Sequence, residues 1–282
     1  MNAETSPNVS SEQIESFKRD GVVHLPQVFE THWLDLLARG IERDMANPTS
    51  RFEARTTPDS EARYFESFWM WSEIDEFRQF VFESPIAGIA AQLLDAGRVN
   101  LVMDNWFRRE AGARSRPPWH HDIAYFDFEG SMCVMWLPLE ATAKDEGISF
   151  VRGSHLWGKL FQRVFFKDHS TRGEPGVVNG IHYDAPPDID ANPREYDLVS
   201  FDCEPGDCIM FDMRTLHGAL AEHTPTRTTQ RFTLRMTAED GVIRYRGDWA
   251  ANERAIFEAE GYGEGDALTG HFFPQLWPPG VS

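Results

Sequence analysis

The sequence has few cysteines, fewer basic than acidic residues, and no long apolar run. Three cysteines among 282 residues are too few for a disulfide scaffold and favour a reducing, cytoplasmic compartment. Lys and Arg number 27 against 45 Asp and Glu, and the resulting net charge of −18 argues against binding to nucleic acid or to an anionic membrane surface. No apolar stretch reaches the roughly 18 residues of a transmembrane helix, and the polar first dozen residues do not resemble a signal peptide. We therefore expect partners other than nucleic acid or membranes, and the sequence does not indicate an oligomeric state.

Apolar and aromatic residues, by contrast, are abundant, at 41% and 13% of the chain, which is enough for a globular core. Apolar residues at helical spacing predict a mostly helical flank over residues 11–97, after a mobile tail over 1–10. Short β-rich segments separated by turn residues fill 98–240 and predict a core of antiparallel strands. With a C-terminal extension over 241–282, we expect one domain that covers the whole chain.

The segment Pro118-Trp119-His120-His121-Asp122 carries the strongest chemical signal. We expect a strand over 119–126, and alternate side chains of a strand share a face, so His120 and Asp122 would point the same way. His217 is the best candidate for a third ligand because it follows a Gly-Asp turn and an apolar strand. Two imidazoles and one carboxylate make a facial triad, which leaves positions open on Fe(II) and suits oxygenases. The sequence thus predicts a metal site at these three residues.

A later strand places Arg231, Thr233 and Arg235 on one face, because they alternate along the chain. A guanidinium pairs bidentately with a carboxylate, so this face could bind the far end of a keto-acid cosubstrate. Arg231 with the Thr233 hydroxyl is our first choice for that contact, and Arg235 is the alternative anchor.

Further polar and aromatic side chains near these motifs could line a pocket for substrate or cosubstrate. The aromatic ones could equally be core residues, and a basic one could equally pair with acidic neighbours. These candidates are Asn105, Arg109, Trp119, Tyr125 and Trp136.

Taken together, these motifs resemble the phytanoyl-CoA dioxygenase (PhyH-like) family of Fe(II)/2-oxoglutarate-dependent oxygenases. The resemblance implies a mainly β fold with flanking helices (α+β) and a double-stranded β-helix core of the jelly-roll or cupin-like type. It also implies metal ligands at His120, Asp122 and His217, with Arg231 as the best match for the arginine that binds 2-oxoglutarate. The matching segments are Phe17 to Val23, Pro118 to Asp122 followed by Tyr125, Trp136 to Leu139, Glu146-Gly147, Val151 to His155, Gly206-Asp207, His217-Gly218 and Arg231 to Arg235.

The resemblance further implies a dioxygenase that uses Fe(II), 2-oxoglutarate and O2, with ascorbate helpful in vitro. It would hydroxylate an unactivated C–H bond of a small organic metabolite or natural-product intermediate and release succinate and CO2. The carboxylate of Asp122 favours hydroxylation over halogenation, since related halogenases have a small residue there, while desaturation stays open. One alternative is a fatty acyl-CoA 2-hydroxylase, which the net charge of −18 disfavours. Another is a non-catalytic metal-binding jelly roll that acts as a sensor, which would not need the arginine strand.

Overall fold

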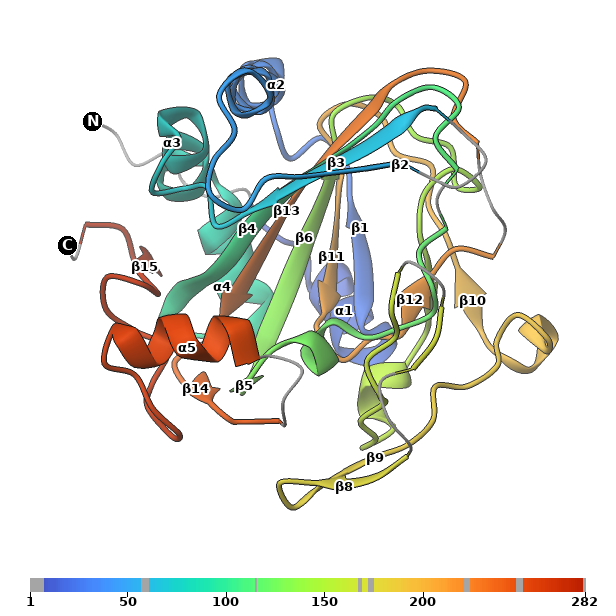
Figure 1. Cartoon of the computed structure of the whole chain (residues 1–282), viewed down its shortest axis with the longest axis vertical. Helices are drawn as coiled ribbons and strands as arrows, with labels where there is room; N and C mark the ends of the chain where they lie inside the picture. The colour runs from blue at the N-terminus through green and yellow to red at the C-terminus, as the bar shows by residue number, and fades with distance from the viewer. Residues whose placement is uncertain are drawn as a thin grey trace.

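A large antiparallel sheet of eight strands forms the centre of the protein (Figure 1). This computed structural model describes residues 8–56, 61–114, 116–166, 169–171, 175–220, 224–246 and 251–280. The strands follow the order β1-β11-β6-β13-β4-β3-β2, and β15 also pairs with β4. Their bounds are β1 (Val22–Leu25), β2 (Glu53–Thr56), β3 (Arg63–Phe68), β4 (Val99–Arg109), β6 (Met132–Pro138), β11 (Cys208–Asp212), β13 (Thr229–Thr237) and β15 (Gln275–Trp277).

A smaller sheet of three strands, in the order β10-β7-β12, forms the second layer of the core. Two further strand pairs, β8 with β9 and β14 with β5, form separate two-stranded sheets. This arrangement confirms the predicted mainly β fold with a jelly-roll core. The bounds are β5 (Phe128–Glu129), β7 (Ser149–Val151), β8 (Gly176–Val178), β9 (Ile181–Tyr183), β10 (Leu198–Val199), β12 (His217–Gly218) and β14 (Val242–Ile243).

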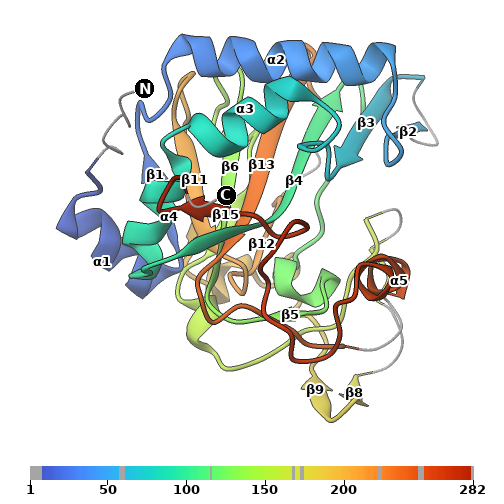
Figure 2. The same ribbon diagram turned by 90° about the vertical axis from the view of Figure 1, so that its left-hand side faces the viewer.

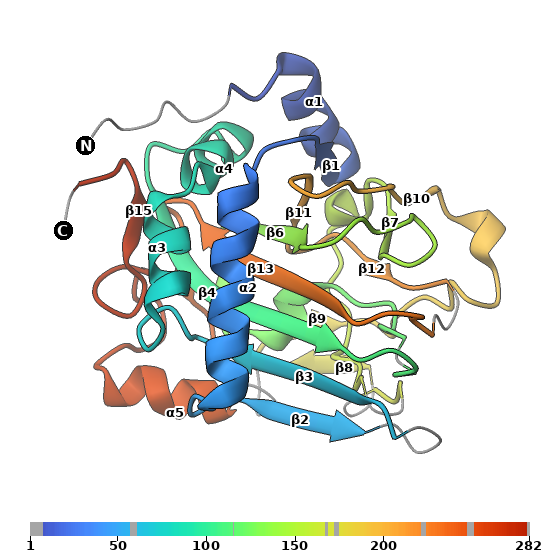
Figure 3. The same ribbon diagram turned by 90° about the horizontal axis from the view of Figure 1, so that it is seen from above.

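Helices α2, α3 and α4 lie on the face of the large sheet opposite the smaller sheet (Figure 2 and Figure 3). Ser10 begins α1 as an N-cap in a capping box with Gln13, and Gly21 ends it in the left-handed conformation with φ of 76°. No helix within the described ranges has both the length and the apolar character needed to cross a membrane. The helices are α1 (Ser11–Asp20), α2 (Thr31–Ala46), α3 (Asp75–Glu83), α4 (Ile86–Leu94) and α5 (Ala251–Ala259).

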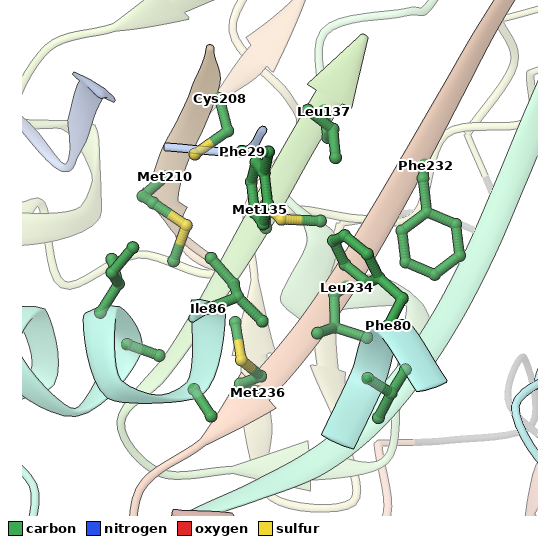
Figure 4. Close-up of a cluster of buried hydrophobic side chains, with 14 of the residues drawn as sticks. Phe29, Phe80, Ile86, Met135, Leu137, Cys208, Met210, Phe232, Leu234 and Met236 are labelled. Carbon is green, nitrogen blue, oxygen red and sulfur yellow. The ribbon is translucent and has the colours of Figure 1, made fainter. Parts of the chain in front are cut away.

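Side chains of β13 alternate between two environments. Phe232, Leu234 and Met236 are fully buried in the hydrophobic cluster beneath the helices, where Figure 4 shows them beside Phe80 and Ile86. Burying each such side chain stabilises the fold by about 1.5–3 kcal/mol. The intervening residues of β13 therefore lie on the opposite face of the sheet, which is directed toward the smaller sheet.

Both flanking segments of the chain contribute strands to the large sheet. β1, β2 and β3 come from residues 11–97, alongside the helices expected there, and β15 comes from residues 241–282. Of the predicted mobile tail, residues 1–7 lie outside the described part of the chain. Val9 is buried and its amide donates to Gln92, so it belongs to the packed structure together with the Ser10 cap.

Candidate metal centre

The backbone brings His120 and His217 side by side, although 97 residues separate them in the sequence. Their main chains form a two-way bridge, with N–H···O distances of 2.9 and 2.8 Å. Asp122 is not on a strand, as the alternation argument assumed, but begins a 3₁₀ turn over Asp122–Tyr125. The prediction of a strand over 119–126 is therefore wrong, and a tight turn directs the carboxylate toward the imidazoles instead.

The three predicted ligands form one compact, buried cluster. The Nε2 atoms of His120 and His217 each lie 3.5 Å from Oδ1 of Asp122. One ligand atom from each residue lies within 4.8 Å of the others, so a single cation can contact all three. The residues are only 6%, 3% and 5% exposed in chain order, which shields such a cation from bulk water.

A hydrogen bond at Nδ1 orients each of the two imidazole rings, on the side of the ring that faces away from Asp122. Nδ1 of His120 lies 2.7 Å from the Pro118 carbonyl, and Nδ1 of His217 lies 3.0 Å from the Thr215 carbonyl. Because a carbonyl only accepts, each Nδ1 must carry the proton, and each Nε2 presents a lone pair to the cluster. Burial lowers the pKa of His217 to about 3, so its ring is neutral, as a metal ligand must be. This donor set fits a divalent metal.

The second oxygen of the Asp122 carboxylate is bound by Arg235 from β13. Nε of Arg235 donates to Oδ2 at 2.8 Å, and Nη2 lies 2.7 Å from the same oxygen. Burial alone would raise the pKa of Asp122, but the Arg235 guanidinium and the two imidazoles outweigh it and hold that pKa well below its usual value. The carboxylate is thus an anion across the physiological range.

Arg231 lies two residues nearer the start of β13 than Thr233 and is engaged much less than Arg235. Its guanidinium lies over the Trp136 ring at 5.3 Å, and its hydrogen bond to the Glu146 carbonyl is long, at 3.4 Å. The buried Nε has no acceptor among the described residues. Burial of the charged group also lowers the pKa of the guanidinium, although Arg231 as a whole is half-buried.

Asn105 on β4 supplies a second buried donor without an acceptor. It pairs with Thr233 across the sheet, and its Oδ1 accepts from Nη1 of Arg235 at 2.7 Å and from the Thr233 hydroxyl. These two donors identify Oδ1, so Nδ2 points elsewhere and has no partner among the described residues, although Asn105 is 0% exposed. Unsatisfied buried donors are rare in native proteins and indicate a missing ligand or water.

The remaining pocket candidates divide into two groups. Trp136 contacts Arg231, and the Tyr125 ring lies 5.4 Å from that of His120 while its hydroxyl donates to the Val164 carbonyl. Trp119 instead packs in a separate apolar cluster and donates its Nε1–H to Asp190. Arg109, at the end of β4, donates to the Ala113 carbonyl. The triad therefore has Tyr125 as a neighbour, whereas Trp119 has a packing role.

One aromatic side chain beside the triad has no counterpart among the sequence predictions. The Phe166 ring lies 4.9 Å from that of His120, edge to face, yet Phe166 is 46% exposed. It also lies 6.0 Å from the Tyr125 ring. No motif or periodicity marks Phe166, because it follows an irregular loop, so only the folded chain reveals this contact.

Comparison with known proteins agrees with this fold. Residues 17–229 match the family model described as phytanoyl-CoA dioxygenase (PhyH). The structure of SnoK, a non-heme alpha ketoglutarate dependent carbocyclase from nogalamycin biosynthesis, matches with a TM-score of 0.71 and 21% identity, over 98% of this chain and 100% of SnoK. The epimerase SnoN in complex with Fe³⁺, alpha ketoglutarate and nogalamycin RO matches with a TM-score of 0.69 and 20% identity, over 94% of this chain and 97% of SnoN.

EctD from S. alaskensis, with 2-oxoglutarate and 5-hydroxyectoine, matches with a TM-score of 0.63 and 17% identity, over 86% of this chain and 80% of EctD. No curated protein sequence matches the chain. At these identities the structural similarities show the fold alone.

The family model covers most of the chain, and the chain belongs to the phytanoyl-CoA dioxygenase family. This confirms the resemblance found in the sequence and makes the protein a dioxygenase by class. Iron and 2-oxoglutarate are the cofactor and cosubstrate of that class, and the buried His-Asp-His cluster offers the ligand set that Fe(II) requires.

Proposed function

We propose that this protein is an Fe(II)- and 2-oxoglutarate-dependent hydroxylase of a small organic molecule, with His120, Asp122 and His217 as the iron ligands. The observation that carries the proposal is the pair of imidazole Nε2 atoms, each 3.5 Å from the same carboxylate oxygen. When bound, Fe(II) and 2-oxoglutarate supply the oxidation: O2 converts 2-oxoglutarate to succinate and CO2, and one oxygen atom enters a substrate C–H bond.

Arg231 is our proposed anchor for the distal carboxylate of 2-oxoglutarate. Its Nε is a buried donor that lacks an acceptor, and a carboxylate would provide one. The Nδ2 of Asn105 is a second such donor on the same face of the sheet. An anion with acceptor groups at both ends would satisfy both donors and offset the burial of the Arg231 charge.

Residues around the triad also limit the kind of substrate. Tyr125 and Phe166 present aromatic rings beside His120, and the exposed part of Phe166 is available to an apolar portion of a substrate. Two basic side chains on nearby segments are paired with acids, Arg116 with Asp190 and Lys159 with Asp184. With the net charge of −18, this gives no support to a surface for the phosphates of coenzyme A.

The proteins of similar fold support a small organic substrate. SnoK is described as a carbocyclase and SnoN as an epimerase of nogalamycin biosynthesis, and the EctD structure contains 5-hydroxyectoine. We extend to this chain only the substrate class, a small metabolite or natural-product intermediate.

An anaerobic titration tests the proposal. The protein loaded with Fe(II) should develop a weak visible absorption band when 2-oxoglutarate is added, and air should then yield succinate. Folded protein that binds iron but gives neither the band nor succinate would refute the enzymatic function and favour a metal-binding sensor. Stimulation of succinate formation then serves as the readout for a screen of candidate substrates.

A further inference from the structure

Arg235 lies on the same face of β13 as Arg231, the face directed toward the smaller sheet, but the surroundings of the two arginines differ. All three nitrogens of its guanidinium are engaged. Nε and Nη2 contact Oδ2 of Asp122, at 2.8 and 2.7 Å, and Nη1 donates to Asn105 at 2.7 Å and approaches the Thr233 hydroxyl at 3.3 Å. An arginine that is already bound in this way is poorly placed to bind a cosubstrate carboxylate.

The contact divides the Asp122 carboxylate into two functionally different oxygens. Oδ2 is occupied by Arg235, while Oδ1 faces the Nε2 atoms of both imidazoles. Rotation of the carboxylate would break two contacts with a charged donor, which are the stronger kind of protein hydrogen bond. Only one oxygen of Asp122 is therefore free for a metal.

Arg235 is itself fixed from several sides. The Phe126 ring lies 5.5 Å beneath its guanidinium carbon, and Asn105 and Thr233 hold its Nη1. The residue is 9% exposed, so little water competes for these contacts. The long side chain of Arg235 thus connects β13 to the 3₁₀ turn that begins with Asp122 and restricts the movement of that carboxylate.

We propose that Arg235 is a positioning residue for the metal centre, which holds Asp122 so that Oδ1 alone faces the metal, and that it is not the anchor of 2-oxoglutarate. This inference rests on the proposed function, because it takes the triad as the metal ligands. The positive charge of Arg235 repels a divalent cation, whereas its hydrogen bonds preorganise Asp122 as a metal ligand. The two effects oppose each other, and preorganisation prevails.

Cobalt(II) is a suitable probe, because its visible absorption reports binding without turnover. We would titrate the full-length wild type, Arg235→Met and Arg235→Lys with Co(II), and verify folding by circular dichroism. Loss of a partner that orients a metal ligand typically costs 10- to 100-fold in affinity, and we expect a loss of this size for Arg235→Met. Arg235→Lys should lose less, since it keeps the charge but not the two-point contact. If Arg235→Met does not fold, Arg235→Lys alone decides, and an affinity equal to that of the wild type would overturn the proposal.

Arg254→Met is a matched control. Nε and Nη2 of Arg254 contact one oxygen of the buried Asp127, at 3.0 and 2.8 Å, and Asp127 is not one of the three proposed ligands. This variant removes a similar arginine pair and should leave Co(II) affinity within about twofold of the wild type, as expected for a residue that orients no ligand. An equal loss in Arg254→Met would show that the effect on Arg235→Met is general destabilisation, which would overturn the proposal.

A second titration, of 2-oxoglutarate into protein saturated with Co(II), separates positioning from anchoring. Arg235→Met should then bind 2-oxoglutarate far more tightly than Arg231→Met does, because Arg235 reaches the proposed cosubstrate donors only indirectly, through Asn105. Unchanged cobalt affinity combined with lost 2-oxoglutarate affinity would make Arg235 the anchor and refute the proposal, as would an increase in cobalt affinity. Failure of the wild type to bind cobalt would instead refute the metal site, and with it the proposed function.

Discussion

Replacement of Arg231 by methionine should weaken 2-oxoglutarate binding without affecting metal binding. Within the described part of the chain, the guanidinium offers a buried Nε without an acceptor, and its Nη2 makes a long contact of 3.4 Å with the Glu146 carbonyl. Two hydrogen bonds from a charged donor contribute about 3 kcal/mol. Because about 1.4 kcal/mol corresponds to a tenfold change, the Kd for 2-oxoglutarate should rise about 100-fold. Methionine keeps an apolar stem of similar length over Trp136, so packing changes little.

The assay is an anaerobic titration of Fe(II)-loaded protein with 2-oxoglutarate, followed by visible absorption. Cobalt affinity is measured separately and should equal that of the wild type. Arg227→Met is the control, because Arg227 is an exposed arginine just before β13 that contributes charge but contacts the Ala141 carbonyl. Wild-type 2-oxoglutarate affinity in Arg231→Met, or an equal loss in Arg227→Met, would refute the assignment of Arg231 as the anchor.

Three other predictions concern metal binding and stability. His217→Ala should abolish stoichiometric cobalt binding in metal analysis. His121→Gln is the control and should retain cobalt, because the His121 ring accepts from the Phe161 amide instead of facing the triad. Cobalt binding by His217→Ala would remove His217 from the ligand set. Gly21→Ala should lower the free energy of unfolding by about 2–4 kcal/mol, because a Cβ would lie 2.4 Å from the Thr215 hydroxyl at φ of +76°. Gly158→Ala, with open space around the added Cβ, should lower it by about 1 kcal/mol. Equal losses for the two variants in chemical denaturation would contradict this reasoning. Burial raises the pKa of Asp104 to about 7, from about 3.9 in the unfolded chain, so between these pH values the folded state binds one more proton than the unfolded chain. The free energy of unfolding should therefore fall by about 3 kcal/mol from pH 5 to pH 8. Urea titrations of Asp104→Asn should show a smaller fall, and an unchanged pH dependence would exclude Asp104 as its source.

Local patterns in the sequence predicted much of this molecule. The spacing of His120 and Asp122, and the turn and strand before His217, were enough to identify three residues that the fold brings together. The alternation of β13 also predicted correctly that Arg231, Thr233 and Arg235 share a face, since residues Phe232 and Leu234 lie in the helix-covered core.

Other features depend on contacts between distant segments, which periodicity does not encode. Arg231 and Arg235 are equivalent by alternation, and only contact with Asp122, 113 residues earlier, distinguishes them. The two-residue spacing of His120 and Asp122 is compatible with both a strand and a tight turn, so the turn that begins at Asp122 could not be recognised from the spacing. Phe166 likewise approaches His120 through an irregular loop.

The two-sided character of β13 has a consequence for how this protein could be altered by evolution or engineering. Odd-numbered positions from 231 to 235 carry the polar site face, and the even-numbered positions between and beyond them carry the core. Substitutions at odd positions therefore change the site while the apolar packing of the even positions stays intact. A single-residue deletion within the strand would exchange the two sets, burying guanidinium groups beneath the helices and turning phenylalanine toward the metal ligands. An insertion or deletion within this strand would thus disrupt the core and the site together, whereas a point substitution alters only one of them.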